Sequence, residues 1–506
     1  MDLLDRLAAL SDLSYQKPPP RRDPWLDYLW RTLQQIALWL LSALALLWRY
    51  GQRIAYQCSS ALERAGRAIA QAARPLAFRI AAGRRAQVIA ALIGVFALIA
   101  HAELASATFI QPGMGIPGWS FVERARCIAC QVASAPNAQQ ALTADEYADL
   151  LLGRMTLDEQ LGQLIIVQFA GQSATPEALR MVTDQGVGGV LSFAANIQTA
   201  DQTRAMTSDL RHAAAIPLLM SVDQEGGLVN RFRSIIGSQP GANAMTTPEI
   251  AYQRGQHDAQ LLQQYGYNLN LAPVVDVGTA NPQLLDRTFG SDPKTVATLA
   301  GAYMAGLQES GAVTASLKHF PGIGATTTDP HLGLPVLTRS RADWERIDLA
   351  PYKTLLATGK VHAIMITHEM IPTVDNQYPS SLSPAVIDGE LRQKLGFQGV
   401  VITDSLYMGA LNARWTVAQA AALAIEAGAD MVIGPQNAQI VAQVKDALKA
   451  ALSSGKLSQA RIEISVKRVL KLKITMGLLP IPRPTPQATS TGHAAAPTNT
   501  PRKNRR

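Results

Sequence analysis

Cysteine is scarce in this sequence, with three in 506 residues, which is too few for a disulfide scaffold. Cys127 and Cys130 form a C-x-x-C pair, but no second pair lies nearby, so a four-ligand zinc site lacks partners. Because no suitable strand–helix–strand pattern surrounds the pair, a local disulfide or two idle thiols is favoured over thioredoxin-type chemistry. Cys58 stands alone, and one cysteine is weak evidence for acylation. The sequence predicts no metal site and no cofactor.

A basic excess is missing from the central part of the chain, although the whole chain has a net charge of +8. Residues 1–85 hold 13 Lys/Arg against 6 Asp/Glu, and residues 481–506 hold 5 basic residues and no acidic one. Residues 86–480 hold 28 Lys/Arg against 32 Asp/Glu and are mildly acidic. A nucleic-acid-binding domain needs a basic face on its folded part. We therefore expect no nucleic-acid partner.

Two uncharged apolar stretches follow a polar N-terminal segment at residues 1–31. They lie within residues 32–48 and 86–107, and each is about the minimum length that spans the hydrocarbon of a bilayer. The connecting residues 49–85 contain eight arginines and a single acidic residue, Glu63, so this loop is expected to stay cytoplasmic. Its spaced arginines suit an amphipathic helix on anionic lipid, with a plain polybasic loop as the alternative. Both flanking ends then face outward.

The second apolar stretch has a competing interpretation as a signal peptide. Arg84 and Arg85, the apolar core and the Ala-Ser-Ala at 105–107 have the pattern of such a peptide with its cleavage site. A signal peptide that begins roughly eighty residues into a chain is unusual, so we favour a membrane anchor; cleavage would give a secreted domain. A buried helical hairpin in a cytosolic protein is a further alternative. We predict a membrane-anchored protein with an extracytoplasmic domain that contacts the lipid bilayer through its N-terminal segments.

Residues 142–479 alternate apolar runs with helical patterns, between a linker at 108–141 and a Pro/Thr-rich basic tail at 480–506 that can bury no core. The apolar runs are 164–169, 189–193, 217–222, 269–275, 313–317, 363–367, 400–403 and 431–433, and helical patterns include 175–185, 200–215, 294–310, 417–427 and 437–453. Repeated strand–helix units imply a parallel sheet, and eight of them favour a closed (β/α)8 TIM-like barrel. An open doubly wound sheet is the structural alternative, although no G-x-G-x-x-G motif follows the first run.

Ionisable residues follow five successive apolar runs. In chain order they are Asp223 and Glu225, Asp276, Lys318 and His319, His368 and Glu369, and Asp404. All follow the C-terminal ends of predicted strands, and in a (β/α)8 barrel that end carries the active site. Packing alone would scatter such residues over both ends of the barrel. The sequence therefore predicts an active site at the C-terminal rim.

An Asp/His pair, Asp329 and His331, lies shortly after the fifth apolar run. Pro330 fixes its own φ and pushes Asp329 toward extended geometry, in which residues two apart point the same way. Asp329 is therefore expected to orient and charge-stabilise the His331 imidazole, as a general acid/base near neutral pH requires. The alternative is an aspartate that caps a turn beside an incidental surface histidine.

Six segments in the central part resemble glycoside hydrolase family 3, specifically its β-N-acetylglucosaminidase branch. They are MTLDEQLGQL (155–164), DQEGG (223–227), NLAPVVD (270–276), RTFG (287–290), KHFPG (318–322) and ITDS (402–405). The resemblance covers roughly residues 142–478, and six motifs in the right order are far more specific than any one alone. It implies a (β/α)8 catalytic domain that cleaves β-linked N-acetylglucosamine with retention, often from peptidoglycan fragments.

The resemblance also implies roles for particular residues. Asp404 takes the position of the nucleophile in the family's Ser/Thr-Asp motif. His331 with Asp329 takes the place of the acid/base that most glycosidases fill with a second carboxylate. The family's sugar-binding positions match Asp223, Arg231, Arg287, Lys318 and His319.

Each of these roles has a structural alternative. Asp404 can cap a helix that begins at Ser405, as aspartates often do after a strand. Arg231 and Arg287 can form salt bridges to Asp276 or Glu225 that only hold the barrel rim together.

The sequence departs from the family's usual pattern at three positions. Leu228 stands where the family often has arginine, and Ile323 where it often has histidine, so two polar groups are missing near the mouth of the site. These changes bear on recognition of the leaving-group sugar and its decoration. Pro330 stands where the Asp-x-His motif often has serine, and it is expected to stiffen the loop that carries His331, giving slower turnover or a loop preorganised for the closed state.

Residues and resemblance together predict an enzyme: a membrane-tethered β-N-acetylglucosaminidase whose monomeric catalytic domain acts on β-linked amino-sugar glycan of the cell wall. The rivals are a family 3 β-glucosidase or broader β-hexosaminidase, and a catalytically idle glycan-binding module. Against a glucosidase stand the histidine loop and the absence of the second domain that often supplies that branch's acid. A neutral imidazole leaves less negative charge near an incoming nucleophile than a glutamate does, so phosphorolysis is a further alternative.

Overall fold

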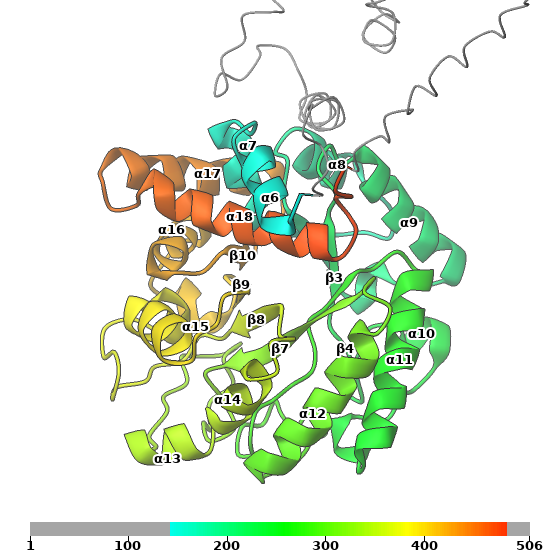
Figure 1. The fold of residues 1–506 in the computed structure, drawn as a ribbon, viewed down its shortest axis with the longest axis vertical. Coiled ribbons are helices and arrows are strands. Elements are labelled where there is room, and N and C mark those ends of the chain that lie inside the picture. The colour runs from blue at the N-terminus through cyan, green and yellow to red at the C-terminus, as the bar shows by residue number, and fades with distance from the viewer. Residues whose placement is uncertain (1–141, 483–506) are drawn as a thin grey trace, which may run out of the picture. The chain divides into compact units, whose positions relative to one another are not determined.

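The computed structural model describes residues 142–482, which form a closed barrel of eight parallel strands (Figure 1). The strands are β1 (Ile165–Gln168), β2 (Gly189–Ser192), β3 (Leu219–Val222), β6 (Leu269–Asn270), β7 (Thr314–Phe320), β8 (Ala363–Ile366), β9 (Val400–Ser405) and β10 (Met431–Ile433). Each overlaps one of the eight apolar runs. Because β1 pairs with β10, the sheet closes on itself; the predicted (β/α)8 barrel is confirmed and the open sheet is excluded.

The barrel encloses a core built from alternate residues of its strands. In β8, Ala363 and Met365 belong to the interior cluster, whereas Ile364 and Ile366 pack in the larger cluster that the helices share. This two-residue alternation follows from the pleat of a strand. Both faces are apolar because helices cover the outside, so each strand appears in the sequence as a continuous apolar run.

Helices follow the strands and surround the barrel (Figure 1). They are α6 (Ala144–Leu152), α7 (Leu157–Gln163), α8 (Pro176–Thr183), α9 (Ala200–Ala213), α10 (Arg233–Ile236), α11 (Pro248–Gln264), α12 (Pro293–Gln308), α13 (Arg341–Arg346), α14 (Ala350–Leu356), α15 (Gly409–Asn412), α16 (Val417–Ala427), α17 (Ala438–Ser453) and α18 (Gln459–Thr475). A π-helical segment, η5 (Ala385–Lys394), and short 3-10 turns complete the shell. The five predicted helices correspond to α8, α9, α12, α16 and α17, with ends that differ by two residues or fewer.

Several helices begin at capping residues that can be recognised in the nearby sequence. Thr156 accepts a hydrogen bond from the Glu159 backbone N–H while the Glu159 side chain accepts one from the Thr156 backbone, which is a complete capping box at the start of α7. Thr416 and Gln419 repeat this arrangement at α16. These exchanges satisfy backbone donors that the first turn of a helix leaves free.

The N-terminal end of the barrel is covered by α18, which packs against α6 and α7 (Figure 1). There the Lys473 ammonium is fully buried and donates to the side-chain oxygen of Gln163 at 2.6 Å and to the carbonyl of Gly188 at 3.0 Å. Burial lowers the pKa of Lys473 to about 7, because a low-dielectric interior disfavours the charged form. This residue is a buried titratable group at the N-terminal end of the barrel.

No helix within residues 142–482 is long and apolar enough to cross a bilayer. The predicted segments 1–31, 32–48, 49–85 and 86–107, the linker 108–141, and the tail from residue 483 onward lie outside the described residues. The predictions of membrane anchoring and of an amphipathic basic loop therefore stay predictions.

Candidate active site

A cavity of about 430 Å³ lies at the C-terminal ends of the barrel strands, within the size range of small-ligand sites. It is lined by seven of the eight predicted site residues, namely Asp223, Arg231, Arg287, Lys318, His319, His331 and Asp404. The eighth, Asp329, does not line the cavity but contacts His331, which does. Further lining comes from Gln168, Leu191, Phe193, Glu225, Val229, Leu271, Gln283, Ile323, Pro330, Met365, Ser405, Tyr407, Met408 and Ile433. Strand ends far apart in the sequence thus meet in one cavity.

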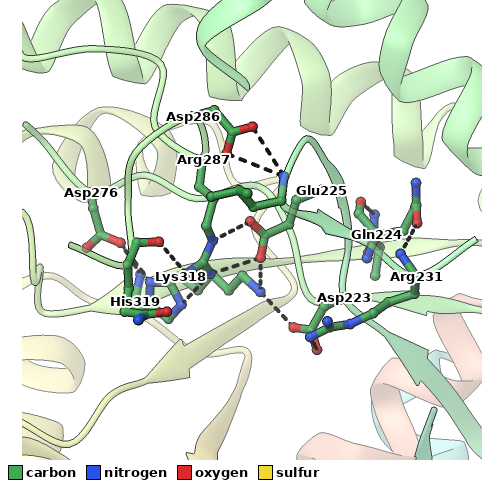
Figure 2. Close-up of polar contacts among 12 residues, drawn as sticks. Asp223, Gln224, Glu225, Arg231, Asp276, Asp286, Arg287, Lys318 and His319 are labelled. Atoms are coloured by element: carbon green, nitrogen blue, oxygen red, sulfur yellow. Dashed lines mark hydrogen bonds and ion pairs between the residues drawn. The ribbon is translucent and has the colours of Figure 1, made fainter. Parts of the chain in front are cut away.

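Lys318 bridges two buried carboxylates on one side of the cavity, as Figure 2 shows. Its ammonium lies 2.7 Å from Asp223 Oδ1 and 2.6 Å from Glu225 Oε1. Burial works against ionisation of both acids, but Lys318 and the neighbouring arginines outweigh it: the pKa of Asp223 falls far below its usual value and that of Glu225 falls to about 2. Lys318 was predicted to follow the end of the strand. That prediction was wrong, because Lys318 lies within β7, which continues to Phe320.

Two arginines complete this network. Arg287 donates from Nε to Glu225 Oε2 at 2.8 Å and from Nη2 to Oε1 at 3.0 Å, a bidentate pair (Figure 2). The structural salt bridge considered for Arg287 is therefore present, and Arg287 also lines the cavity. Arg231 lies 3.4 Å from Asp223 Oδ2 and over the ring of Phe193, so the expected partner for it, Asp276 or Glu225, was wrong.

His319 is held in one orientation by Asp276. Its Nδ1 lies 2.7 Å from Asp276 Oδ2, and the backbone N–H groups of His319 and Ile323 donate to the same carboxylate. The other ring nitrogen, Nε2, lies 3.3 Å from Nη2 of Arg287. Because a guanidinium only donates, this contact assigns Nε2 as the acceptor and the proton to Nδ1. His319 thus presents a ring of fixed orientation at the cavity wall.

The Asp404 carboxylate differs from the other acids of the cavity. It lies near the end of β9 (Val400–Ser405), is only half-buried, and forms no ion pair within residues 142–482, whereas Asp223 and Glu225 are each paired with a cation. One oxygen, Oδ1, accepts the backbone N–H of Ser405 at 2.7 Å. Because no cation within the described residues pairs with it, Asp404 is the carboxylate of the cavity best placed to attack a substrate.

His368 contacts the end of β9 and the segment around Ser381 through its two ring nitrogens. Its Nε2 lies 3.1 Å from the carbonyl of Ser405 and its Nδ1 lies 2.6 Å from the hydroxyl of Ser381. Burial lowers the pKa of His368, and the Asp404 carboxylate opposes that effect only in part. The neighbouring Glu369 follows β8 as expected but does not line the cavity; it is fully buried, and burial raises its pKa well above the usual value.

The predicted Asp/His pair is formed. Asp329 Oδ1 lies 2.9 Å from Nδ1 of His331, and the His331 side chain is 61% exposed. The geometry differs from the prediction, because the segment is a turn: the backbone N–H of His331 donates to Asp329 Oδ1 and the N–H of Gly333 donates to the Asp329 carbonyl. The pairing therefore comes from an aspartate-capped turn rather than from extended backbone.

Gln283 holds the other oxygen of this aspartate, donating from Nε2 to Asp329 Oδ2 at 2.5 Å. The sequence carries no signal for this contact, since the two residues lie 46 positions apart in different loops. Glu225 was expected at the rim but was not among the residues given a substrate-binding role, although its position two residues after Asp223 was a usable signal.

The turn that carries His331 is hydrogen-bonded to the start of α15, shortly after Asp404; this contact is called the latch. The backbone N–H of Gly409 donates to the His331 carbonyl at 3.2 Å, and that of Ala410 donates to the Pro330 carbonyl at 3.1 Å. A side chain at Gly409 would place its Cβ 2.4 Å from the His331 carbonyl oxygen, so only glycine permits this approach. The latch brings the imidazole and the free carboxylate to the same cavity.

Within residues 142–482, no group of three or more His, Cys, Asp or Glu side chains is arranged to hold a metal ion. The described chemistry of the cavity consists of an unpaired carboxylate, a carboxylate-paired imidazole and a wall of fixed charges. This combination suits nucleophilic attack with proton transfer on a polar, hydroxyl-rich substrate.

The chain is similar in sequence and in structure to known proteins. Residues 156–472 match the family model described as glycosyl hydrolase family 3 N terminal domain. A beta-hexosaminidase of Xylella fastidiosa is 34% identical over 279 residues (53% of this chain, 82% of that protein), and Beta-hexosaminidase LpqI of Mycobacterium tuberculosis is 35% identical over 331 residues (62% and 82%). The solved structure of a glycoside hydrolase family 3 beta-N-acetylglucosaminidase from Paenibacillus has a TM-score of 0.62 at 35% identity, covering 68% of this chain and 65% of that one. The family match includes every residue that lines the cavity.

Proposed function

The chain belongs to glycosyl hydrolase family 3, and on that premise we propose that it releases terminal β-linked N-acetylglucosamine by a two-step retaining mechanism. It is a β-N-acetylhexosaminidase, a glycosidase. The observation that carries the mechanistic part is the latch: Asp404 and His331 line one cavity, and the turn that bears His331 is joined to Gly409 and Ala410, shortly after Asp404, by hydrogen bonds at 3.2 and 3.1 Å.

In the first step, the Asp404 carboxylate attacks the anomeric carbon while the bond to the leaving-group oxygen breaks. His331, as imidazolium, gives its proton to that oxygen, and the negative charge of Asp329 stabilises the imidazolium. The product of this step is a glycosyl ester on Asp404. The mechanism requires Asp404 to be ionised and His331 to be protonated when substrate binds.

In the second step, the roles reverse. Neutral His331 takes a proton from a water molecule, the water oxygen attacks the anomeric carbon, and Asp404 leaves as a carboxylate. The sugar is released with its original β configuration, because two inversions have occurred at the same carbon.

The ion-pair network supports the positioning of the sugar. Asp223, Lys318 and Arg231 present charged oxygen and nitrogen atoms to the cavity from mutually fixed positions, and charge-assisted hydrogen bonds to hydroxyl groups are stronger than neutral ones. Since these charges compensate one another before substrate arrives, little reorganisation is needed when it binds.

Covalent labelling tests the proposed nucleophile. We expect a 5-fluoro N-acetylglucosaminyl inactivator to leave one glycosyl adduct on the peptide containing Asp404, detected by mass spectrometry. Asp404→Asn should take up no label and lose turnover, whereas Asp201→Asn, which changes an exposed aspartate on α9, should label normally. An adduct on another residue would refute the assignment of Asp404.

Product analysis tests the reaction and the sugar. We expect free N-acetylglucosamine in phosphate buffer, and an aryl β-N-acetylglucosaminide to be cleaved much faster than the matching aryl β-glucoside. N-acetylglucosamine 1-phosphate as the main product would establish a phosphorylase instead, and preference for the glucoside would establish a β-glucosidase.

The natural glycan and the location of the enzyme are also part of the proposal. We place the catalytic domain on the outer side of a membrane, where cell-wall glycan is the β-linked amino-sugar polymer available to it, on the basis of the arginine-rich stretch between two apolar stretches. Protease added to intact cells should then degrade the catalytic domain. Protection in intact cells with degradation after lysis would contradict this location.

A further inference from the structure

The three most exposed large apolar side chains among residues 142–482 all lie within two residues of a side chain that lines the cavity. Leu332 is 85% exposed, Leu228 is 59% exposed and Leu285 is 57% exposed. Leu332 directly follows His331, and Leu228 directly precedes the cavity-lining Val229. Leu285 lies two residues before Arg287, which also lines the cavity. Single exposed leucines need no explanation, but three around one opening do.

Hydrogen bonds join the segments that carry these leucines into one rim. The backbone N–H of Leu228 donates to the carboxylate of Asp286 at 3.2 Å, which ties the β4–β5 hairpin (Gln224–Gly226 and Val229–Asn230) to the Leu285 loop. Figure 2 shows Asp286 pointing away from the ion-pair network on that same loop. Gln283, from the loop of Leu285, donates to Asp329 in the turn of Leu332. The three leucines therefore lie on segments that are joined to one another rather than on unrelated parts of the surface.

The backbone at Leu285 indicates that its exposure is imposed. It is the one residue other than glycine with a positive φ, 26°, within the described part of the chain. A branched side chain is disfavoured in that region, and such conformations persist only where the surrounding structure holds them. Strained residues concentrate at binding and catalytic sites, and here the strained residue displays an apolar side chain at the edge of the cavity.

We propose that Leu228, Leu285 and Leu332 form an aglycone subsite, and that the preferred substrate carries an apolar group on the leaving-group side of the N-acetylglucosamine. This inference rests on the proposed function. His331 protonates the leaving-group oxygen, so the aglycone must leave the cavity on the side of the His331 turn. Leu332 adjoins that residue, and the other two leucines continue the same edge.

The physical gain is the removal of exposed apolar surface from water. Each buried methylene contributes about 0.8 kcal/mol, or roughly fourfold in an equilibrium constant. An octyl chain that covers even two or three methylenes of contact should thus raise kcat/KM over a methyl glycoside by about 10-fold to 50-fold.

The test compares three substrates on the full chain: the methyl and octyl β-N-acetylglucosaminides, the latter below its micelle-forming concentration, and β-N-acetylglucosaminyl fluoride, which has no aglycone bulk. The readout is the ratio of kcat/KM for octyl over methyl, with the fluoride as a reference for the chemistry itself. We expect a wild-type ratio above about 10, and a fall of at least about fivefold in that ratio for Leu228→Ser/Leu332→Ser. Ile464→Ser, which changes an exposed apolar residue on α18, is the matched control and should keep the wild-type ratio.

The outcomes separate this inference from the function on which it rests. Turnover of the fluoride with an octyl-to-methyl ratio near one overturns the aglycone subsite and leaves the glycosidase intact. No turnover of any of the three substrates removes both. If the double variant keeps the ratio but loses self-association in sedimentation, the leucines serve a contact between copies of this chain, and the subsite is likewise refuted.

Discussion

Replacing Gly409 by alanine should separate the acid function of His331 from the rest of the site. The added Cβ would lie 2.4 Å from the His331 carbonyl oxygen, and that oxygen belongs to backbone rather than to the end of a flexible side chain. An ordinary contact starts near 3.4 Å, so the turn must retreat by about 1 Å. The hydrogen bond from the Gly409 N–H to the same oxygen, now 3.2 Å, lengthens with it.

A displacement of this size is large for proton transfer. Misplacing a catalytic group by about 1 Å costs on the order of a hundredfold in rate, which corresponds to about 2.7 kcal/mol of transition-state stabilisation. The loss should depend on the leaving group, because only a poor leaving group needs its oxygen protonated. We therefore expect kcat/KM for the methyl β-N-acetylglucosaminide to fall about a hundredfold, and that for the glycosyl fluoride to fall by less than about threefold.

The assay is steady-state hydrolysis of both substrates by wild type, Gly409→Ala and the control Gly389→Ala. Gly389 lies in the π-helical segment η5, and a Cβ there meets nothing within 4 Å, so the control makes the same chemical change without a clash. Equal losses on both substrates, or full activity of Gly409→Ala on the methyl glycoside, would refute the argument that the latch positions His331 as the acid.

Three further predictions concern buried or linked polar groups. Gln283→Leu removes the donor to Asp329 and should lower kcat/KM for the methyl glycoside about tenfold with the fluoride again spared; a wild-type kcat/KM on both substrates would show that this contact is idle. Lys318→Met leaves two buried carboxylates without their shared cation and should lower the free energy of unfolding by about 3 kcal/mol, near the low end for broken buried pairs because arginines still contact both acids; urea denaturation with a loss below about 1 kcal/mol would contradict this. For Lys473, whose pKa is lowered by burial from 10.5 to about 7, the unfolded chain binds the proton more tightly, so the stability of wild type relative to Lys473→Met should rise with pH from about 7 to 10.5 and level off below 7; a flat difference across that range would refute it.

The barrel could be predicted from the amino-acid sequence because the relevant information is local. Strands buried on both faces must be continuous apolar runs, and their number and spacing could be counted directly. Caps such as Thr156 with Glu159 mark helix starts within four residues. In such barrels the C-terminal ends of all strands lie at one rim. The ionisable residues that follow the predicted strands therefore indicated an active site at that rim.

Which charges pair could not be predicted in this way, because it depends on the three-dimensional fold. Lys318 and Asp223 are 95 positions apart, and several acids and cations compete at the same rim, so the sequence could not show that Arg231 pairs with Asp223 or that Arg287 pairs with Glu225. The same holds for Glu369, which follows its strand like the others but is buried away from the cavity. Pairing depends on distances of a few ångströms that arise only when the barrel closes, whereas strand and helix patterns depend on neighbours along the chain.

The His331 turn shows both sources of information at one place. Asp329 and His331 were identifiable as a pair from their spacing, but the expected extended backbone was wrong and the structure has a turn stabilised by the aspartate itself. What joins the His331 turn to the segment after Asp404 is the approach of Gly409 to the turn, a contact between segments that follow different strands. Local chemistry supplied the groups, and packing between distant segments of the chain supplied their relative position.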